Sequence, residues 1–122
     1  MFNMQWDIEF YELSDRCKPV LEFIDSLPTK DKAKIVKEID LLEDYGIELR
    51  PPKVWKITGK RYSGLWELRV KFSSNDYRIF YFLYSGGIFV LLHGFIKKKN
   101  RTDRRELEIA KSRMDEYKKF RR

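Results

Sequence analysis

The chain has a single cysteine, a single histidine and no long apolar run. The lone Cys17 excludes a disulfide within the chain, and we expect a small half-buried residue there rather than a reactive thiol. No run reaches the roughly 18 apolar residues that a membrane-spanning helix needs. The acidic residues and loose alternation of the first twelve positions also argue against a signal peptide. These features predict a cytoplasmic protein.

The same scarcity removes several classes of catalytic site. One histidine and one cysteine cannot supply the ligands of a zinc ion. The sequence contains neither a GxxxxGK loop, which would cradle phosphates, nor a serine-centred nucleophile elbow. We therefore predict that the protein uses no metal and no other cofactor.

Positive charge is concentrated in one part of the chain. Residues 1–52 hold 7 Lys or Arg and 12 Asp or Glu, a net charge of −5, whereas residues 53–122 hold 19 and 7, a net charge of +12. A solvated surface would mix the two signs. The concentration favours a polyanionic partner such as nucleic acid over a generally basic surface.

The order of predicted elements defines the fold class. The length gives room for one domain with a modest core, so we predict a single domain over residues 1–122. Periodicity and breakers predict strands at 3–12, 53–58, 65–73, 76–85 and from Ile88 towards Lys99, and helices at 14–26, 30–45 and after Asp103. The order β-α-α-β-β-β-β-α indicates a small α+β domain whose helices cover one face of the sheet.

The C-terminal segment reads as a docked helix. Asp103 and Glu106 fit a capping box at its start. Its apolar positions recur with helical spacing, at Leu107, Ala110, Met114 and Tyr117. The alternative, a helix lying on a membrane surface, is disfavoured by the narrow stripe and by acidic residues on its polar side.

The pattern of residues 65–99 predicts a three-stranded antiparallel meander with two tight turns. Asn tolerates the left-handed backbone that a two-residue hairpin turn requires, so the first turn is expected at Ser74-Asn75. Glycine is equally permissive, so the second turn is expected at Gly86-Gly87. These turns place Arg69 opposite Phe80, Lys71 opposite Arg78, His93 opposite Phe80, and Phe95 opposite Arg78.

Because directly opposed residues share a face, this register separates two surfaces. One surface carries charged and aromatic side chains: Glu67, Arg69, Lys71, Arg78, Phe80, His93, Phe95 and Lys97. The reverse surface is apolar and is the predicted core: Trp66, Leu68, Val70, Phe72, Tyr77, Ile79, Tyr81, Leu83, Val90, Leu92, Gly94 and Ile96. A slip by one residue would bury the cations, which costs too much when they are unpaired.

The charged surface suits metal-free cleavage of RNA. That reaction needs a base for the 2′-hydroxyl, cations around the phosphorane and an acid for the 5′-oxygen. Arg69 and Arg78 would supply most of the stabilisation, since a guanidinium matches two phosphate oxygens and stays charged. Lys71 and Lys97 would add positive field.

The proton-transfer groups are less well defined by the sequence. His93 is the only histidine, and cations around it would keep its ring neutral and able to act as a base; its alternative role is packing on Phe80. Glu67 is the other acid–base residue, and its alternative role is a salt bridge. Phe80 and Phe95 could stack on unpaired bases.

Several segments resemble a known family. LWELR (65–69), YRIFYF (77–82), HGFIKK (93–98) and TDRRELEIAKSRMDEY (102–117) resemble the RelE/ParE toxin superfamily, and most of all its HigB-like, phage-derived subgroup. LPTKDKAKIVKEIDLLEDYG (27–46) is similar to the helical pair of that family. The resemblance covers nearly the whole chain.

The resemblance implies a compact α+β fold with a curved antiparallel sheet, and a toxin of a type II toxin–antitoxin pair. Nuclease members of the superfamily cut messenger RNA on the translating ribosome without a metal. Arg69 and Arg78 match the family's sheet arginines, His93 the histidine of HGF, and Lys97 and Lys98 the basic pair that follows it. The implied partner is a HigA-like antitoxin with a helix-turn-helix domain, which would be the only link to operator DNA.

Two other functions remain open at the level of sequence. ParE-like relatives share the fold and inhibit DNA gyrase, although the clustered sheet arginines and HGFIKK speak against that reading. The third function is an RNA- or DNA-binding module without catalysis, which would give the same salt-dependent affinity for phosphates.

Overall fold

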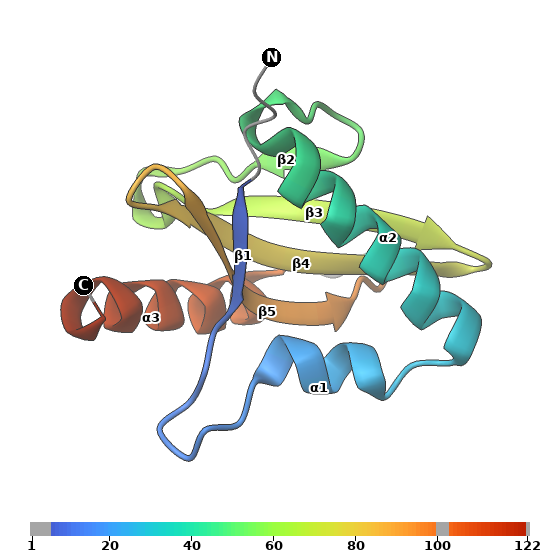
Figure 1. Ribbon diagram of the computed structural model, residues 1–122, viewed down its shortest axis with the longest axis horizontal. Coiled ribbons are helices and arrows are strands. Elements are labelled where there is room, and N and C mark those ends of the chain that lie inside the picture. Colours follow the sequence, from blue (N-terminus) through green and yellow to red (C-terminus); the bar gives the residue numbers. More distant parts are fainter. Residues whose placement is uncertain (1–5, 100–102, 122) are drawn as a thin grey trace.

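The computed structural model describes residues 6–99 and 103–121. Its elements are, in chain order, β1 (Asp7–Phe10), α1 (Pro19–Asp25), α2 (Thr29–Tyr45), β2 (Val54–Lys56), β3 (Trp66–Phe72), β4 (Asn75–Tyr84), β5 (Ile88–Ile96) and α3 (Arg104–Phe120), with 3₁₀ turns at Gly46–Glu48 and Lys60–Tyr62 (Figure 1). This confirms the predicted α+β class and the predicted order of elements. The first strand is shorter than predicted, and positions 3–5 of that prediction lie outside the described residues.

The five strands form one mixed sheet in the order β1-β5-β4-β3-β2. The meander of β3, β4 and β5 is antiparallel, as predicted, and β2 joins its edge in the same manner. The prediction of a wholly antiparallel sheet is wrong at the other edge, where β1 pairs with β5 in parallel. A parallel pair needs a long connection, and the two helices and three strands between β1 and β5 provide it.

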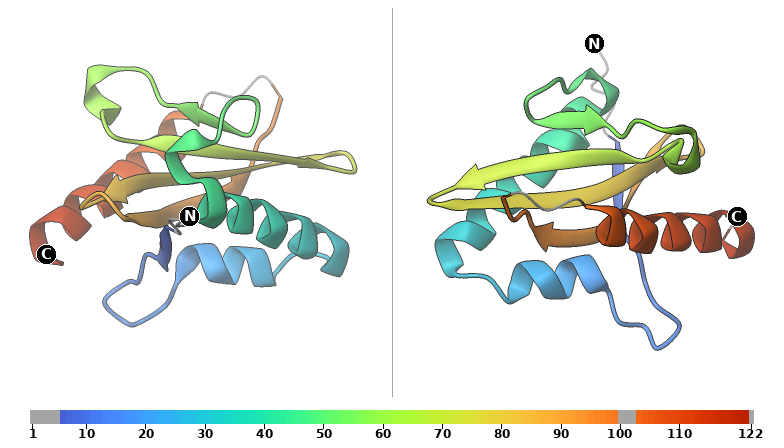
Figure 2. Two further views of the ribbon diagram at one scale, coloured as in Figure 1. Left: turned by 45° about the horizontal axis from the view of Figure 1, so that its top comes forward. Right: turned by 180° about the vertical axis from the view of Figure 1, so that it is seen from behind.

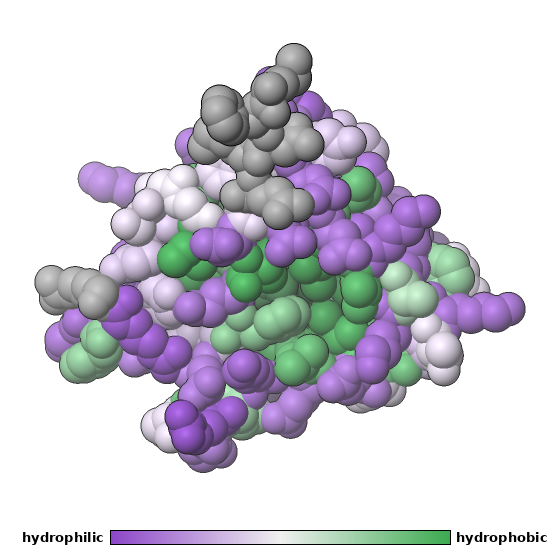
Figure 3. All heavy atoms as spheres, viewed as in Figure 1, coloured by the Kyte–Doolittle hydropathy of each residue, from purple (hydrophilic) through white to green (hydrophobic). Residues whose placement is uncertain are grey.

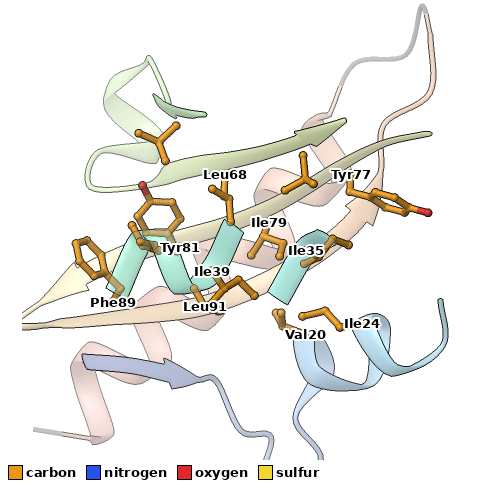
Figure 4. Close-up of a cluster of buried hydrophobic side chains, with 13 residues drawn as sticks. Val20, Ile24, Ile35, Ile39, Leu68, Tyr77, Ile79, Tyr81, Phe89 and Leu91 are labelled. Carbon is orange, nitrogen blue, oxygen red and sulfur yellow. The ribbon is translucent and has the colours of Figure 1, made fainter. Parts of the chain in front are cut away.

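One face of the sheet packs against α1 and α2. Their apolar side chains meet those of β3, β4 and β5 in a closed cluster (Figure 4), which includes Val20, Ile24, Ile35, Ile39, Leu68, Val70, Tyr77, Ile79, Tyr81, Phe89 and Leu91. Trp66, Phe72 and Leu83 pack against its margin. Most of the predicted core of β3 and β4 is therefore confirmed.

The other face of the sheet is also partly covered, by α3 (Figure 2). The helical stripe of Ala110, Met114 and Tyr117 packs on side chains of β4 and β5, and this second cluster includes Leu65, Phe80, Phe82, Val90 and Leu92. The docked helix was expected, but the prediction that all helices lie on one face is wrong. The physical reason is that Phe80, Phe82, Val90 and Leu92 form an apolar half on this face, and that half needs a cover.

A β-bulge explains why Val90 and Leu92 were assigned to the wrong face. The predicted pairing Phe80–His93 is correct, but the next pair is Tyr81–Leu91, so Leu92 is an extra residue on β5. An extra residue reverses the alternation beyond it. Phe89 and Leu91 consequently take the places predicted for Val90 and Leu92.

The turn of the first hairpin lies one residue earlier than predicted, which shifts the pairing of its two strands by two residues. The turn falls at Ser73-Ser74, with Ser73 at φ +57°, and Phe72 pairs with Asn75. A shift of two preserves the face of every side chain but changes the partners. Lys71 now lies opposite Asp76, and Arg69 lies opposite Arg78. The observed register is physically better, because the predicted one set Lys71 directly against Arg78 without an acid between them.

The face that carries α1 and α2 has an apolar groove at its surface. Figure 3 shows hydrophobic side chains gathered between these helices and β1, with charged side chains around them. The groove holds about 320 Å³ and is lined by Ile8, Phe10, Leu21, Ile24, Asp25, Lys32, Val36, Ile39, Asp40 and Glu43. Within the described residues, no helix combines the length and apolar character needed to cross a membrane.

Gly46 ends α2 in a backbone conformation that only glycine adopts easily, with φ +51°. A Cβ atom there would lie 2.1 Å from the indole nitrogen of Trp6. We expect Gly46→Ala to lower the free energy of unfolding by about 1–3 kcal/mol, measured by urea denaturation. Gly87→Ala is the matched control, because Gly87 has open space around it and no positive φ. Equal stability of the two variants would contradict this assignment.

Candidate nucleic-acid interface

A four-residue ion network occupies the middle of β3 and β4. The guanidinium of Arg78 donates to both oxygens of Asp76, each at 3.0 Å, and to Oε1 of Glu67 at 3.2 Å. The same Oε1 accepts from Nε of Arg69 at 2.5 Å. Arg78 is therefore bound by two acids, Asp76 from its own strand and Glu67 from β3.

Burial makes this network strong and demanding. The side chains of Arg78 and Glu67 are only 9% and 3% exposed, so neither charge could remain without its partner. Burial opposes the charged form of Arg78, but the hydrogen bonds and charges of Asp76 and Glu67 outweigh it and raise the Arg78 pKa. The hydrogen bond from Arg78 lowers the pKa of Asp76, against the effect of burial. Both shifts favour the charged forms, so Arg78 and Asp76 are ionised at neutral pH.

Arg69 differs from Arg78 in its access to solvent. Its side chain is 36% exposed, and its guanidinium carbon lies 4.7 Å from the ring centroid of Trp55. Glu67 holds its Nε, while its two terminal nitrogens make no hydrogen bond to any described residue. The guanidinium is therefore held at its Nε by Glu67 and on one face by Trp55. Its outer fork, the two terminal nitrogens, can bind an anion.

These side chains open onto a groove of about 540 Å³ on the face that carries α3. The groove is lined by Trp55, Lys56, Ile57, Thr58, Tyr62, Glu67, Arg69, Arg78, Lys97, Asp103 and Leu107. Four cations and two carboxylates line it, so its net charge is positive. Lys97 and Asp103 form an ion pair at 2.9 Å. The groove can therefore take a phosphate together with a flat apolar group.

Four of the nine predicted site residues line this groove: Glu67, Arg69, Arg78 and Lys97. Lys71 and Lys98 are exposed on the surface outside the groove. Phe80 is fully buried beneath α3, so it cannot stack on a base in this structure. Phe95 is half-buried, with its ring 5.2 Å from that of Phe80 and 5.7 Å from that of His93.

His93 lies on the predicted face but outside the groove, beneath α3. Its Nε2 is 2.8 Å from Oε1 of Glu106, and its Nδ1 is 3.4 Å from Nη1 of Arg113. A carboxylate only accepts and a guanidinium only donates, so a neutral ring with its proton on Nε2 fits both contacts. Burial lowers the His93 pKa; Arg113 lowers it further, and the hydrogen bond to Glu106 acts in the opposite direction.

The predicted capping box does not form at the start of α3. Asp103 occupies the N-cap position without a side-chain bond to the helix backbone and binds Lys97 instead. Glu106 binds His93. Both acids thus tie the first turn of α3 to β5 and its continuation, which sets one wall of the groove.

Sequence reasoning missed the residues that β2 and the following loop bring to the groove. Trp55 and Lys56 come from β2, and Tyr62 comes from the 3₁₀ turn after it. Tyr62 donates to Glu108 of α3, and that hydrogen bond, together with burial, raises the Tyr62 pKa. The only available signal was an aromatic residue next to a lysine on a short predicted strand.

The described residues contain no group of three or more His, Cys, Asp or Glu side chains that could hold a metal ion. The thiol of Cys17, on the loop before α1, donates to Glu22. That hydrogen bond, with burial, raises the Cys17 pKa to about 11, so the group is a neutral thiol at pH 7. Cys17 is half-buried, as expected.

The small α+β fold, with a mixed sheet and three helices, is consistent with a RelE-like fold. The family described as Phage derived protein Gp49-like (DUF891) matches residues 22–115. The chain therefore belongs to this family of phage-derived, RelE/HigB-like toxins, which is associated with toxin–antitoxin pairs. Among curated proteins, none matches the chain.

Removing Glu67 should destabilise the fold, because Arg78 would keep a buried charge with one partner fewer. We expect Glu67→Ala to lower the free energy of unfolding by about 3 kcal/mol in urea denaturation. Asp115→Ala removes an exposed partner of Lys111 on α3 and should cost about 0.5 kcal/mol or less. Similar small losses in both variants would show that the network is not a structural constraint.

His93 should titrate below its ordinary pKa of 6.5, because burial disfavours the imidazolium. As the only histidine, it can be followed by NMR through its ring C–H signals. Because the pKa of His93 is lower in the folded protein, its contribution to the free energy of unfolding should be constant above about pH 6.5. That contribution should be lost as the pH drops from about 6.5 through the folded pKa.

Glu106→Gln should lower the His93 pKa further by removing the carboxylate that favours the charged ring. Asp115→Asn, on an exposed part of the same helix, should leave that pKa unchanged. A His93 pKa at or above 6.5 in the unmodified protein would overturn the buried placement beneath α3.

Proposed function

We propose that the protein is the toxin of a type II toxin–antitoxin pair and a ribosome-dependent, metal-independent endoribonuclease that cuts messenger RNA. The observation that carries this proposal is the state of Arg69. Its guanidinium is held by Glu67 and Trp55, and its outer fork is open to a cationic groove. A preorganised cation of this kind stabilises the charge that develops on a phosphorane.

The chemistry can be assigned to residues of the groove. Glu67 would take the proton from the 2′-hydroxyl, whose oxygen attacks the adjacent phosphorus. Arg69 and Arg78 would stabilise the phosphorane, and Lys97 would give a proton to the departing 5′-oxygen. The products are a 2′,3′-cyclic phosphate and a 5′-hydroxyl. In this assignment His93 does not touch the RNA, because Glu106 and Arg113 of α3 occupy both of its ring nitrogens. Its role would be to hold α3 in position beside the groove.

The charge balance of the groove supports a role for the ribosome. Arg78 is neutralised by two carboxylates, so the positive field of the groove comes mainly from Arg69 and Lys56. Affinity for naked RNA scales with the number of phosphates neutralised and should therefore be modest. A ribosome would present the message at high local concentration, which compensates for weak intrinsic binding.

Membership of the Gp49-like family supports a proposal for the partner and for the place of action. We propose a HigA-like antitoxin with a helix-turn-helix domain, through which the complex would reach operator DNA. Messenger RNA and ribosomes are the targets, so the site of action would be the cytoplasm. Residues 1–122 would act as one toxin domain.

Arg69→Ala should reduce cleavage of a reporter message by about 100- to 1,000-fold in a purified translation system. The measurement is the rate at which new ends carrying a 2′,3′-cyclic phosphate appear. Lys37→Ala is the matched control, since it removes an exposed cation of α2 and should cut at the normal rate. Cleavage by a folded Arg69→Ala variant at the normal rate would refute the proposal.

The rival functions give different results in the same system. A gyrase inhibitor would leave messages intact and produce broken DNA in cells. A non-catalytic module would bind RNA with a strong dependence on salt and release no cyclic phosphate.

A further inference from the structure

Trp55 has no structural role in either hydrophobic cluster. It lies on the edge strand β2, where its neighbour Val54 enters the core and Trp55 points to the opposite face. Trp55 is 38% exposed and belongs to neither cluster, whereas Trp66 packs against the core. Large aromatic surface left in a groove is more typical of a binding site than of a packing site.

The orientation of the Trp55 ring is fixed from two sides. Its indole nitrogen donates to the carbonyl oxygen of Pro52 at 3.2 Å. The guanidinium of Arg69 lies 4.7 Å from the ring centroid, and Arg69 is itself held by Glu67. Trp55 and Arg69 therefore form a rigid, flat surface, which loses little conformational entropy when a ligand binds.

The surroundings of this pair define the chemistry of the ligand. Ile57 and Leu107 line the same groove, and Lys56 and Lys97 add positive charge. A groove of about 540 Å³ lies in the size range of small-ligand sites. A ligand that is flat, aromatic and joined to a phosphate matches this combination, and a nucleotide of a single strand has all three properties.

We propose that Trp55, together with the guanidinium stacked on it, binds an unpaired nucleobase of the RNA next to the phosphate held by Arg69. This deepens the proposed function and rests on it. Bases stack on aromatic rings and on the planes of arginine side chains. The edge of the same guanidinium remains available for a bidentate bond to phosphate.

Stacking on Trp55 and Arg69 predicts a site that accepts any of the four bases. Stacking uses the face of a base, which every base offers, so the pair would select unpaired nucleotides over duplex. A purine offers more stacking area than a pyrimidine, so a modest purine preference is expected.

Binding can be measured without cleavage by using a 2′-O-methyl RNA tetranucleotide as the probe, because its blocked 2′-oxygens cannot attack the phosphorus. Trp55→Ala should weaken its binding to the purified protein by about 5- to 100-fold in fluorescence anisotropy. Trp55→Phe should restore most of the affinity. Phe120→Ala, which removes another exposed aromatic side chain at the end of α3, should change nothing.

A second probe separates stacking from an indirect effect on Arg69. In this probe one base of the tetranucleotide is removed, so that an abasic sugar remains. When the removed base is the one that stacks on Trp55, binding to the normal protein should weaken by a factor similar to that of Trp55→Ala. The same abasic probe should bind Trp55→Ala no more weakly than the intact probe does. If Trp55→Ala weakens binding of the intact probe and of the abasic probe equally, the stacking proposal is overturned. The same holds if the normal protein shows no measurable binding of the tetranucleotide.

Failure of this inference and failure of the proposed function are distinguishable. If Trp55→Ala cuts messages with unchanged half-saturating concentration and rate, the nuclease stands and the base site is refuted. If the tetranucleotide binds through Trp55 but no message is ever cut, the base site stands and the nuclease is refuted.

Discussion

The central constraint in this molecule is the ion network that joins β3 and β4. Arg78 is almost completely buried, so the chain must bring Glu67 and Asp76 to it at once. The observed register does so while the apolar side chains of both strands still reach the core. Structure and candidate chemistry therefore depend on the same contacts, because the acid that stabilises Arg78 also aims Arg69 into the groove.

The sheet works as a layer with two different faces. Helices α1 and α2 close one face with a continuous apolar cluster (Figure 4). On the other face α3 covers only the apolar half, and its first turn borders the cationic groove. The ties from β5 and its continuation to Glu106 and Asp103 fix that border. The position of α3 thus decides which side chains of the sheet can meet a ligand.

The sequence predicts the fold class well because its periodic segments and turn residues are strong local signals. It does not predict the bulge, because Val90, Leu91 and Leu92 are all apolar and any register would bury them. The two-residue shift in the pairing of β3 and β4 was not predicted for a similar reason. Serine and asparagine are both compatible with the turn, and only the pairing of charges across the strands distinguishes the two registers.

The sequence predicts which candidate residues lie together where one segment supplies them. Arg69, Glu67 and Arg78 are identified by alternation within the meander. Trp55 and Tyr62 are not, since they reach the groove from separate elements. Phe80 was assigned to RNA because a helical stripe does not reveal which face of a sheet it will cover.

The central claim is that the exposed fork of Arg69 binds the phosphate that is cut. The most direct test is a structure of the protein on a translating ribosome whose message carries 2′-O-methyl groups, so that cleavage cannot occur. The account predicts a phosphate within hydrogen-bond distance of the terminal nitrogens of Arg69, with Glu67 beside the neighbouring 2′-oxygen. A message bound elsewhere on the protein, with the groove empty, would contradict it.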